Sequence, residues 1–222
     1  MGAARIIAFV KQLVLDLIPA PLPNFDNWVA GGNSEARKAL FDATFNSPAA
    51  KVIYLWGVAG SGKSHALAAV VAGWQQRADF SPEDAPVMVV DDVGRLDDGQ
   101  QVALFNAINQ RSLVAGSCVI AAGNTAPRDL PLRPELTSRL GSGLVFQLLP
   151  LTDAEKALAL NAHALSRGFK LSADVSGYLL RHSRRDMASL IAMLDALDQY
   201  SLETGREITV PLLKQLSQPA LI

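Results

Sequence analysis

The sequence contains a single cysteine, Cys118, among its 222 residues. One cysteine cannot form a disulfide within the chain, whereas small proteins of oxidising compartments commonly carry paired cysteines. Cys118 stands in the apolar run SCVIAAG, where a thiol usually behaves as a small hydrophobic side chain. The sequence therefore predicts a buried, unpaired Cys118 in a protein of a reducing compartment.

An excess of either charge is also missing, because 20 lysine and arginine residues face 21 aspartate and glutamate residues. A chain that binds nucleic acid or an anionic membrane by itself usually carries a basic surface that attracts the phosphates. We therefore expect no autonomous DNA binding and no membrane binding.

Long apolar runs are lacking as well. The segment RIIAFVKQLVLDLI, residues 5–18, is interrupted by Lys11, Gln12 and Asp16. It falls short of the roughly 20 unbroken apolar residues of a membrane span, and no small-residue cleavage site follows it. These features predict a cytoplasmic protein.

Apolar residues are nevertheless abundant enough for a real core, since 50% of the chain is hydrophobic. Up to residue 150, short β-branched and aromatic runs alternate with helical patterns, which is typical of an α/β fold with a parallel sheet covered on both faces. Strands are expected over 51–57, 86–93, 117–124 and 144–150. Asn33 or Ser34 can cap a first helix with apolar positions Ala36, Leu40 and Phe41. Further helices are expected over 63–77 and over GQQVALFNAINQRS.

From residue 151 the pattern contains helices alone, which predicts a small all-helical domain after the α/β core. The expected helix starts are a capping box of Thr152 with Glu155, a cap at Ser172, the pair Ser183 and Asp186, and Pro211 in a first turn.

Residues 57–64, GVAGSGKS, match the phosphate-loop pattern G-x-x-x-x-G-K-[ST] between an expected strand and an expected helix. The glycines let successive N–H groups point at phosphate oxygens, and the helix N-terminus adds the positive end of its dipole. Lys63 would reach the terminal phosphates, and Ser64 would bind Mg²⁺. The candidate nucleotide-binding residues here are Gly57, Gly60, Ser61, Gly62, Lys63, Ser64 and His65.

Two carboxylates end the expected strand VMVVDDV. Asp91 is the natural second ligand for Mg²⁺, because a phosphate loop needs a carboxylate on a neighbouring strand. Asp92 stands where many ATPases carry a glutamate that polarises the attacking water, and it is one methylene shorter. Hydrolysis by this chain alone is therefore expected to be slow.

An apolar peptide, KQLVLDL at residues 11–17, precedes the proline-rich run IPAPLPN. One interpretation is an amphipathic helix packed on the core. The other, which we favour, is a tethered peptide whose side chains enter another protein's groove, because the prolines argue for a linker. The predicted organisation is a tether over residues 1–23, a core over 24–150 and a helical domain over 151–222.

The order of motifs resembles a family. GVAGSGKS, the Asp-Asp strand end, Asn124 after a third strand, Arg139 in ELTSRLGSG and Arg185 in SRRDMASL follow the arrangement of the AAA+ ATPases, and NFDNWVAGGN and LTSRLGSGL look like two boxes of the DnaA-like members. The resemblance covers roughly residues 22–215. It implies an AAA+ core with a helical lid, ADP or ATP as ligand with Mg²⁺, Asn124 at the catalytic end, and Arg185 on the nucleotide phosphates.

DnaA continues into a helix-turn-helix domain, and no basic recognition helix follows the bundle here, so the chain looks closer to the Hda family of DnaA regulators. That resemblance implies that Arg139 acts as an arginine finger on ATP bound to DnaA. It also implies that an N-terminal peptide binds the DNA polymerase sliding clamp. The matching peptide residues are Gln12, Leu13, Leu15 and Leu17.

The same resemblance places Trp28, Val29 and Phe25 on the adenine side of the site, with core packing as the alternative for the two aromatic residues. Three departures stand out. First, the short interval between Lys63 and Asp91 leaves no room for the second strand of relatives, so the Asp-Asp strand is expected at a sheet edge. Pro82, Pro86 and nearby acidic residues would protect this edge from pairing with another chain. Second, Asn124 stands where DnaA-like proteins often carry aspartate, and third, MGAARIIAFV precedes the peptide.

Two other functions remain open at this level. One is a self-contained AAA+ ATPase, such as a helicase-loader-like protein, and the other is an adaptor whose nucleotide is structural. The sequence also leaves open which nucleotide is resident and whether the protein forms a homo-oligomer.

Overall fold

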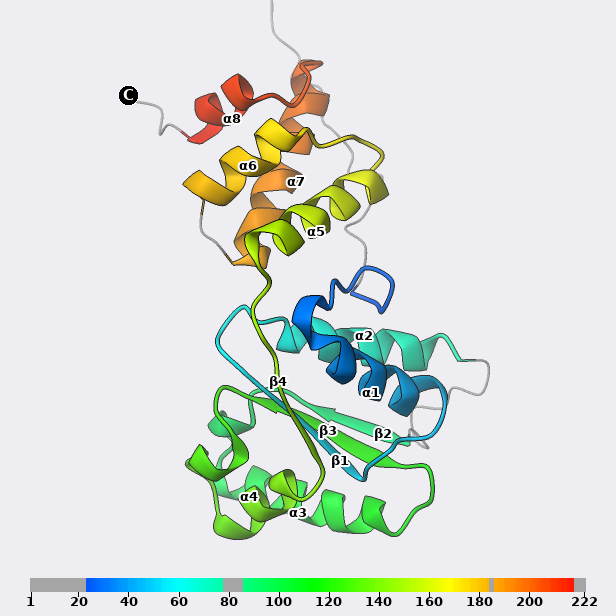
Figure 1. Ribbon diagram of the computed structural model, residues 1–222. Helices are drawn as coiled ribbons and strands as arrows, with labels where there is room; N and C mark the ends of the chain where they lie inside the picture. The colour runs from blue at the N-terminus through cyan, green and yellow to red at the C-terminus, as the bar shows by residue number, and fades with distance from the viewer. Residues whose placement is uncertain (1–22, 78–85, 184–185, 218–222) are drawn as a thin grey trace, which may run out of the picture.

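The structure is a computed structural model that describes residues 23–77, 86–183 and 186–217. Its centre is one sheet of parallel strands in the order β2-β3-β1-β4 (Figure 1). The strands are β1 (Val52–Trp56), β2 (Val87–Val90), β3 (Cys118–Gly123) and β4 (Leu144–Gln147). All four expected strands are therefore present, each shorter than predicted.

Alternate side chains of the central strand β1 enter two separate apolar cores. Ile53 and Leu55 pack with helices α1 (Ser34–Phe45) and α2 (Lys63–Gln75), whereas Val52 and Tyr54 pack with α3 (Asp98–Ser112) and α4 (Pro134–Gly141). Figure 1 shows the first pair of helices on one face of the sheet and the second pair on the other. The predicted parallel sheet covered on both faces is confirmed.

The Asp-Asp strand β2 pairs with β3 and lies at an edge of the sheet in the described part of the chain. Only Val87 is buried in this strand, which agrees with the expected edge position. Pro82 and its acidic neighbours lie outside the described residues, so the expected protection of this edge by that segment stays a prediction.

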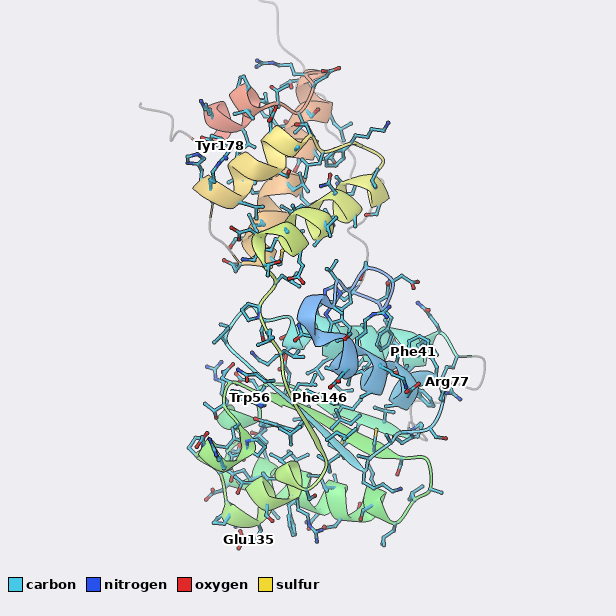
Figure 2. The ribbon with its side chains drawn as sticks, viewed as in Figure 1. Phe41, Trp56, Arg77, Glu135, Phe146 and Tyr178 are labelled. Atoms are coloured by element: carbon cyan, nitrogen blue, oxygen red, sulfur yellow. The ribbon has the colours of Figure 1, made fainter. Side chains whose placement is uncertain are left out.

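Helix α1 differs from the expectation in two details. The Asn33 side chain does not cap the helix; it bonds instead to the backbone of Leu149, with 2.9 Å from Nδ2 to the carbonyl oxygen and 2.7 Å from the Leu149 nitrogen to Oδ1. Phe41 is 40% exposed, although Leu40 is fully buried, and its ring packs on Phe25 and Phe45 at the surface seen in Figure 2.

A separate apolar core holds the C-terminal helices together. They are α5 (Asp153–Ser166), α6 (Ala173–His182), α7 (Met187–Thr204) and α8 (Val210–Ser217), and fully buried leucines on α5, α6 and α7 fill the space between them. This all-helical lid follows the α/β core, as predicted (Figure 1).

The capping predictions for the lid are confirmed at two positions and wrong at a third. Thr152 and Glu155 form the reciprocal capping box, and the Ser172 hydroxyl accepts from the Val175 N–H. Ser183, by contrast, ends α6, and the Asp186 carboxylate caps α7 by accepting from the Ser189 N–H. An aspartate in extended conformation just before the first helical residue satisfies an orphan N–H, which the more distant Ser183 cannot do.

Helix α4 was not anticipated. It begins with Pro134 in its first turn and buries Leu136 and Leu140, four residues apart, so the local pattern does contain a helix signal. Within residues 23–77, 86–183 and 186–217, no helix is long and apolar enough to cross a membrane.

Candidate nucleotide-binding site

The phosphate loop occupies the turn from β1 into α2, as the sequence predicts, and its glycines are structurally required. Gly60 and Gly62 have φ of +79° and +96°, a region that L side chains rarely adopt. At Gly57 a Cβ would lie 2.5 Å from the carbonyl oxygen of Leu148 and 2.9 Å from Oγ of Ser61. Larger residues at these positions would disrupt the turn that directs N–H groups inward.

Lys63 lies inside this loop and is only 9% exposed. Its ammonium donates to the carbonyl oxygens of Gly57 at 2.8 Å and of Val58 at 3.0 Å. Desolvation lowers the pKa of Lys63, while the charges of Asp91 and Asp92 act in the opposite direction. A desolvated cation held by two neutral carbonyls is poised to exchange them for an anionic ligand, which would compensate its charge better.

Ser61, in the same loop, has a hydroxyl with no hydrogen-bond partner although it is buried among the described residues. A buried polar atom without a partner is unusual and calls for a ligand or water. Its position beside Gly57 and Lys63 fits a loop whose partner is a phosphate group.

The two predicted magnesium ligands meet. The Ser64 hydroxyl donates to Oδ2 of Asp91 at 2.7 Å, and Oδ1 of Asp91 accepts from the Asp92 N–H at 2.8 Å. In the described part of the chain no group of three or more histidine, cysteine or acidic residues could hold a metal by itself. One hydroxyl and one carboxylate suit Mg²⁺, which takes its remaining ligands from water and substrate phosphates.

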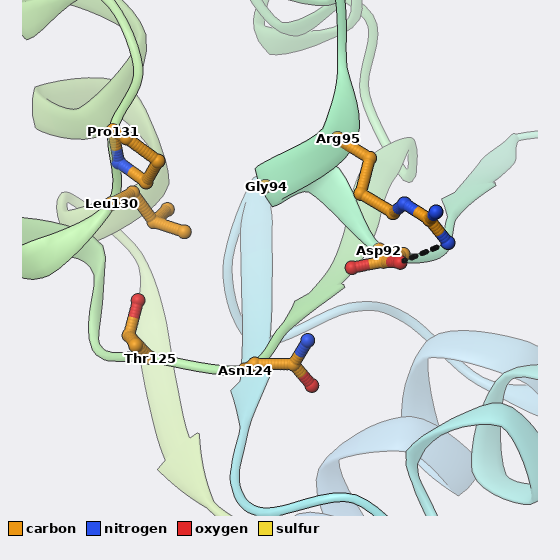
Figure 3. A pocket seen from close by; sticks show the side chains of 7 residues that line it. All are labelled: Asp92, Gly94, Arg95, Asn124, Thr125, Leu130 and Pro131. Atoms are coloured by element: carbon orange, nitrogen blue, oxygen red, sulfur yellow. Dashed lines mark ion pairs between the residues drawn. The ribbon is translucent and has the colours of Figure 1, made fainter.

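Asp92 and Asn124, the candidates for the catalytic end, line one pocket of about 380 Å³ at the carboxyl ends of β2 and β3 (Figure 3). Asp92 has φ of 47° and ψ of 50°, the left-handed region, and is the one non-glycine residue with positive φ among the described residues. Its carboxylate lies 3.7 Å from the Arg95 guanidinium, an ion pair that the sequence did not suggest.

The adenine-side candidates divide. Phe25 and Trp28 are both buried in the core beneath α1 and α2, and their rings lie 6.3 Å apart. Trp28 also borders the phosphate loop, because a Cβ at Gly62 would lie 3.7 Å from its indole nitrogen. Trp28 is therefore a core residue that also borders the phosphate loop, whereas Phe25 is a core residue and Val29 is half-buried beside Trp28. Their placement on the adenine side stays a prediction.

The His65 side chain contacts the turn that precedes Trp28 rather than the phosphate loop. Its Nε2 is 3.2 Å from Oδ1 of Asn27. Desolvation lowers the pKa of His65, and a backbone hydrogen bond with Asn24 partly opposes this shift. A neutral imidazole bound to the turn over 24–27 links the start of α2 to the segment that carries Trp28.

Arg139 is exposed near the end of α4, where it could reach another molecule. Its guanidinium carbon lies 5.9 Å from the ring centroid of Phe105, so α3 supports the side chain. Arg185 and the peptide residues Gln12, Leu13, Leu15 and Leu17 lie outside the described residues, and their roles stay predictions.

Three residues in or next to the site were missed by sequence reasoning. Asp186, which caps α7, lies against the phosphate loop, because a Cβ at Gly60 would be 3.6 Å from its Cβ. Tyr54 is fully buried and donates from its hydroxyl to the Thr125 carbonyl at 3.0 Å, which supports the loop after β3. Arg95 could have been found only from the turn that follows Asp92.

The chain is similar in its lid to one protein family and in its fold to several solved structures. The family described as "Hda, lid domain" matches residues 153–216. Domain III of DnaA from Thermotoga maritima superposes with a TM-score of 0.72 at 23% identity, over 90% of this chain and 100% of that chain. AMPPCP-bound DnaA from Aquifex aeolicus superposes with a TM-score of 0.68 at 19% identity, over 82% of this chain and 66% of that chain. The RuvB Holliday junction branch migration motor of Thermotoga maritima superposes with a TM-score of 0.65 at 16% identity, over 88% of this chain and 71% of that chain.

The fold and the phosphate loop together have the arrangement of the AAA+ class, with an α/β core followed by a helical lid. Within that class the architecture is DnaA-like, and the lid matches that of Hda. The resemblance to Hda and DnaA-like AAA+ proteins that the sequence suggested is confirmed for the fold and, over residues 153–216, for the lid.

Proposed function

We propose that this protein regulates the initiation of chromosome replication. In this role it binds an adenine nucleotide with Mg²⁺, docks on the DNA polymerase sliding clamp through residues 12–17, and stimulates hydrolysis of ATP bound to DnaA through Arg139. The observation that carries the proposal is the match of residues 153–216 to the Hda lid, because it separates this chain from other AAA+ proteins of similar fold.

Nucleotide binding is supported by the loop chemistry. Lys63 is desolvated, Ser61 has a buried hydroxyl with no partner among the described residues, and Ser64 is hydrogen-bonded to Asp91. The DnaA of Aquifex aeolicus, which has the same fold, is an AMPPCP complex. An adenine nucleotide would bring phosphate to the first two groups and metal-bound oxygens to the third.

The exposure of Arg139 supports action on a partner. A guanidinium on a short helix at the surface, backed by Phe105, can enter another subunit's site and neutralise charge that develops on the transferred phosphate. Arginine fingers are worth roughly 10³ to 10⁵ in rate where they are used.

The finger is tested by measuring hydrolysis of DnaA-bound ATP in the presence of clamp loaded on DNA. Arg139→Ala should lower the stimulated rate by about 10³, the lower end of the range for fingers. Arg128→Ala is the matched control, since Arg128 is also an exposed arginine, with its side chain 87% exposed. Equal stimulation by wild type and Arg139→Ala would remove the finger from the proposal.

Clamp docking is tested separately with immobilised clamp. Wild type should be retained, and the double variant Gln12→Ala with Leu13→Ala should be lost, because the glutamine amide and the leucine side chain are the expected anchors. Equal retention of both proteins would refute the tethered peptide and favour packing of that segment on the core.

A self-contained ATPase is the second candidate, because Lys63, Ser64 and Asp91 are arranged as such an enzyme would need. Turnover by the purified chain that is lost in Lys63→Ala and indifferent to clamp and DnaA would favour it. Tightly held ADP with no turnover in any assembly would instead favour an adaptor with a structural nucleotide.

A further inference from the structure

The ion pair between Asp92 and Arg95 occupies the carboxylate that the hydrolysis reaction would use. The two groups are 3.7 Å apart, and both residues line the pocket that also contains Asn124 and Thr125 (Figure 3). A carboxylate that is to polarise a water must accept a hydrogen bond from that water. Among the described residues, the Asp92 carboxylate instead forms an ion pair with the Arg95 guanidinium.

The backbone brings this pair together. Residues Val93–Arg95 form a 3-10 turn that starts at Asp92, and the Arg95 N–H donates to the Asp92 carbonyl at 3.0 Å. This hydrogen bond closes the turn and brings Arg95 back beside Asp92. The left-handed conformation of Asp92 begins this turn and directs its side chain accordingly.

The turn is anchored from within and cannot easily be displaced. Val93 is fully buried and packs in the core between the sheet and α3, where a Cβ at Gly123 would lie 3.4 Å from it. On the opposite wall the Tyr54 hydroxyl fixes the Thr125 carbonyl. The pair itself is accessible, with side-chain exposures of 86% for Arg95 and 41% for Asp92. A rigid turn therefore presents an exchangeable ion pair.

We propose that Arg95 is a positioning residue that holds the Asp92 carboxylate away from the attacking water and so suppresses ATP hydrolysis by this chain itself. The inference rests on the proposed nucleotide-binding function and adds a regulation of the same site. Hydrolysis joins a water oxygen to the γ-phosphorus, breaks the bond from that phosphorus to the β–γ bridging oxygen, and passes the water's proton through an acceptor to solvent. Arg95 withholds Asp92 from the acceptor role.

The test is single-turnover ATP hydrolysis by the purified full chain. Arg95→Ala should raise the rate by about two- to fivefold, the range by which an exposed ion pair can shift an equilibrium. Arg95→Lys keeps the charge and should stay near wild type. In an Asp92→Asn background, removal of Arg95 should change nothing, because the arginine acts through Asp92.

Arg128→Ala is the matched control, since Arg128 is equally exposed and also pairs with a nearby acid, Asp129, at 3.5 Å. Its rate should equal that of wild type. A rate for Arg95→Ala that is unchanged or reduced overturns the inference, and so does an increase that persists with Asp92→Asn.

Affinity gives a readout that does not depend on turnover. The ratio of ATP to ADP affinity, measured by displacement of a fluorescent analogue, should be the same for wild type and Arg95→Ala. A loss confined to ATP means that Arg95 contacts the terminal phosphate, and it overturns the positioning role. Failure of the wild type to bind either nucleotide overturns the proposed function as well, whereas normal binding with an unchanged rate overturns only this inference.

Discussion

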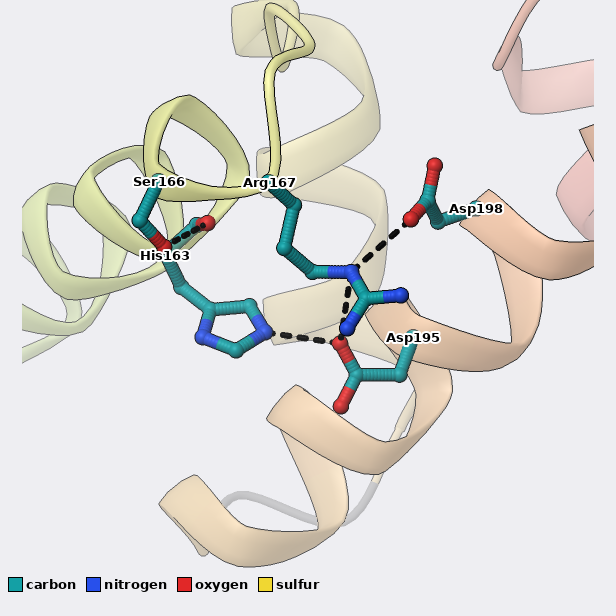
Figure 4. Close-up of polar contacts among 5 residues, drawn as sticks. All are labelled: His163, Ser166, Arg167, Asp195 and Asp198. Carbon is teal, nitrogen blue, oxygen red and sulfur yellow. Dashed lines mark hydrogen bonds and ion pairs between the residues drawn. The ribbon is translucent and has the colours of Figure 1, made fainter. Parts of the chain in front are cut away.

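The lid and the α/β core hold their polar side chains in opposite ways. In the lid, Arg167 donates to Asp198 at 2.8 Å with side-chain exposures of 8% and 11%. The same guanidinium lies 3.7 Å from Asp195, whose carboxylate is 2.7 Å from Nε2 of His163 (Figure 4). Polar groups on α5 and just after it thus pair with carboxylates on α7 in a largely buried network.

In the described part of the core, the buried polar groups other than Lys63 of the phosphate loop are neutral. Burial raises the pKa of Tyr54 to about 12, and burial raises the pKa of Cys118 to about 11 against the nearby charges of Arg111 and Lys51. The charged side chains Lys63, Asp91 and Asp92 lie at the candidate nucleotide-binding site instead. The lid therefore uses charge to fix two helices, whereas the core reserves charge for a ligand.

The largest effect should come from breaking the lid network. Arg167→Ala leaves the Asp198 carboxylate buried without its main partner, which should lower the free energy of unfolding by about 3 kcal/mol, the lower end of the range for such pairs. Urea denaturation followed by circular dichroism measures it. Arg128→Ala, at an exposed pair, should stay within about 0.5 kcal/mol. Similar losses for both variants would contradict the comparison.

The neutral core should respond to alkaline pH. The pKa of Cys118 is raised from 9.0 to about 11 in the folded protein, so the thiol's contribution is complete below pH 9 and is lost as the pH rises to 11. A shift of this size corresponds to a loss of stability of at most about 3 kcal/mol. Unfolding free energies between pH 8 and pH 11 should fall less steeply for Cys118→Ala than for wild type. Parallel curves would exclude the thiol as a cause.

Lys63 separates binding from stability. Lys63→Ala should weaken adenine nucleotide binding by roughly 10- to 100-fold, since a hydrogen bond to a charged group is worth about 1.5–3 kcal/mol. Its unfolding free energy should change by less than about 1 kcal/mol, because the cost of desolvating the ammonium offsets the two carbonyl bonds that it gains in the folded protein. Calorimetric titration and urea denaturation give both numbers. A large loss of stability would make the lysine a structural residue.

The smallest effect concerns the start of the lid. Thr152→Ala removes the hydroxyl from the capping box with Glu155 and should cost about 1 kcal/mol. Thr204→Ala is a matched control near the end of α7, where the hydroxyl donates to the Tyr200 carbonyl at 2.7 Å and caps no helix start. Thermal unfolding should shift for the first variant more than for the second.

Local chemistry explains what could be predicted from the sequence. The phosphate loop and the Thr152–Glu155 box are short patterns whose residues interact with their own neighbours, so they can be read without the fold. Asp91 could be assigned because parallel strands end at the same edge of a sheet, which brings it to Ser64.

The features that were missed depend on geometry that a sequence does not display. Asn33 was expected as a helix cap, but its amide is used by Leu149, 116 residues away. The left-handed backbone of Asp92 follows from the turn that buries Val93, and without that turn the pairing with Arg95 has no signal. Helix α4 was overlooked because its eight residues show a single pair of apolar positions.

The pair of hydrogen bonds between Asn33 and Leu149 has a mechanical consequence. Leu149 lies in the segment that leads from β4 into the lid, and Asn33 ends the turn that follows Trp28 and Val29. Rotation of the lid about that segment must carry this turn with it or break both bonds together. The position of the turn after Trp28 and Val29, beside the phosphate loop, is thus coupled to the angle of the lid. The Asn33 side-chain amide makes this coupling.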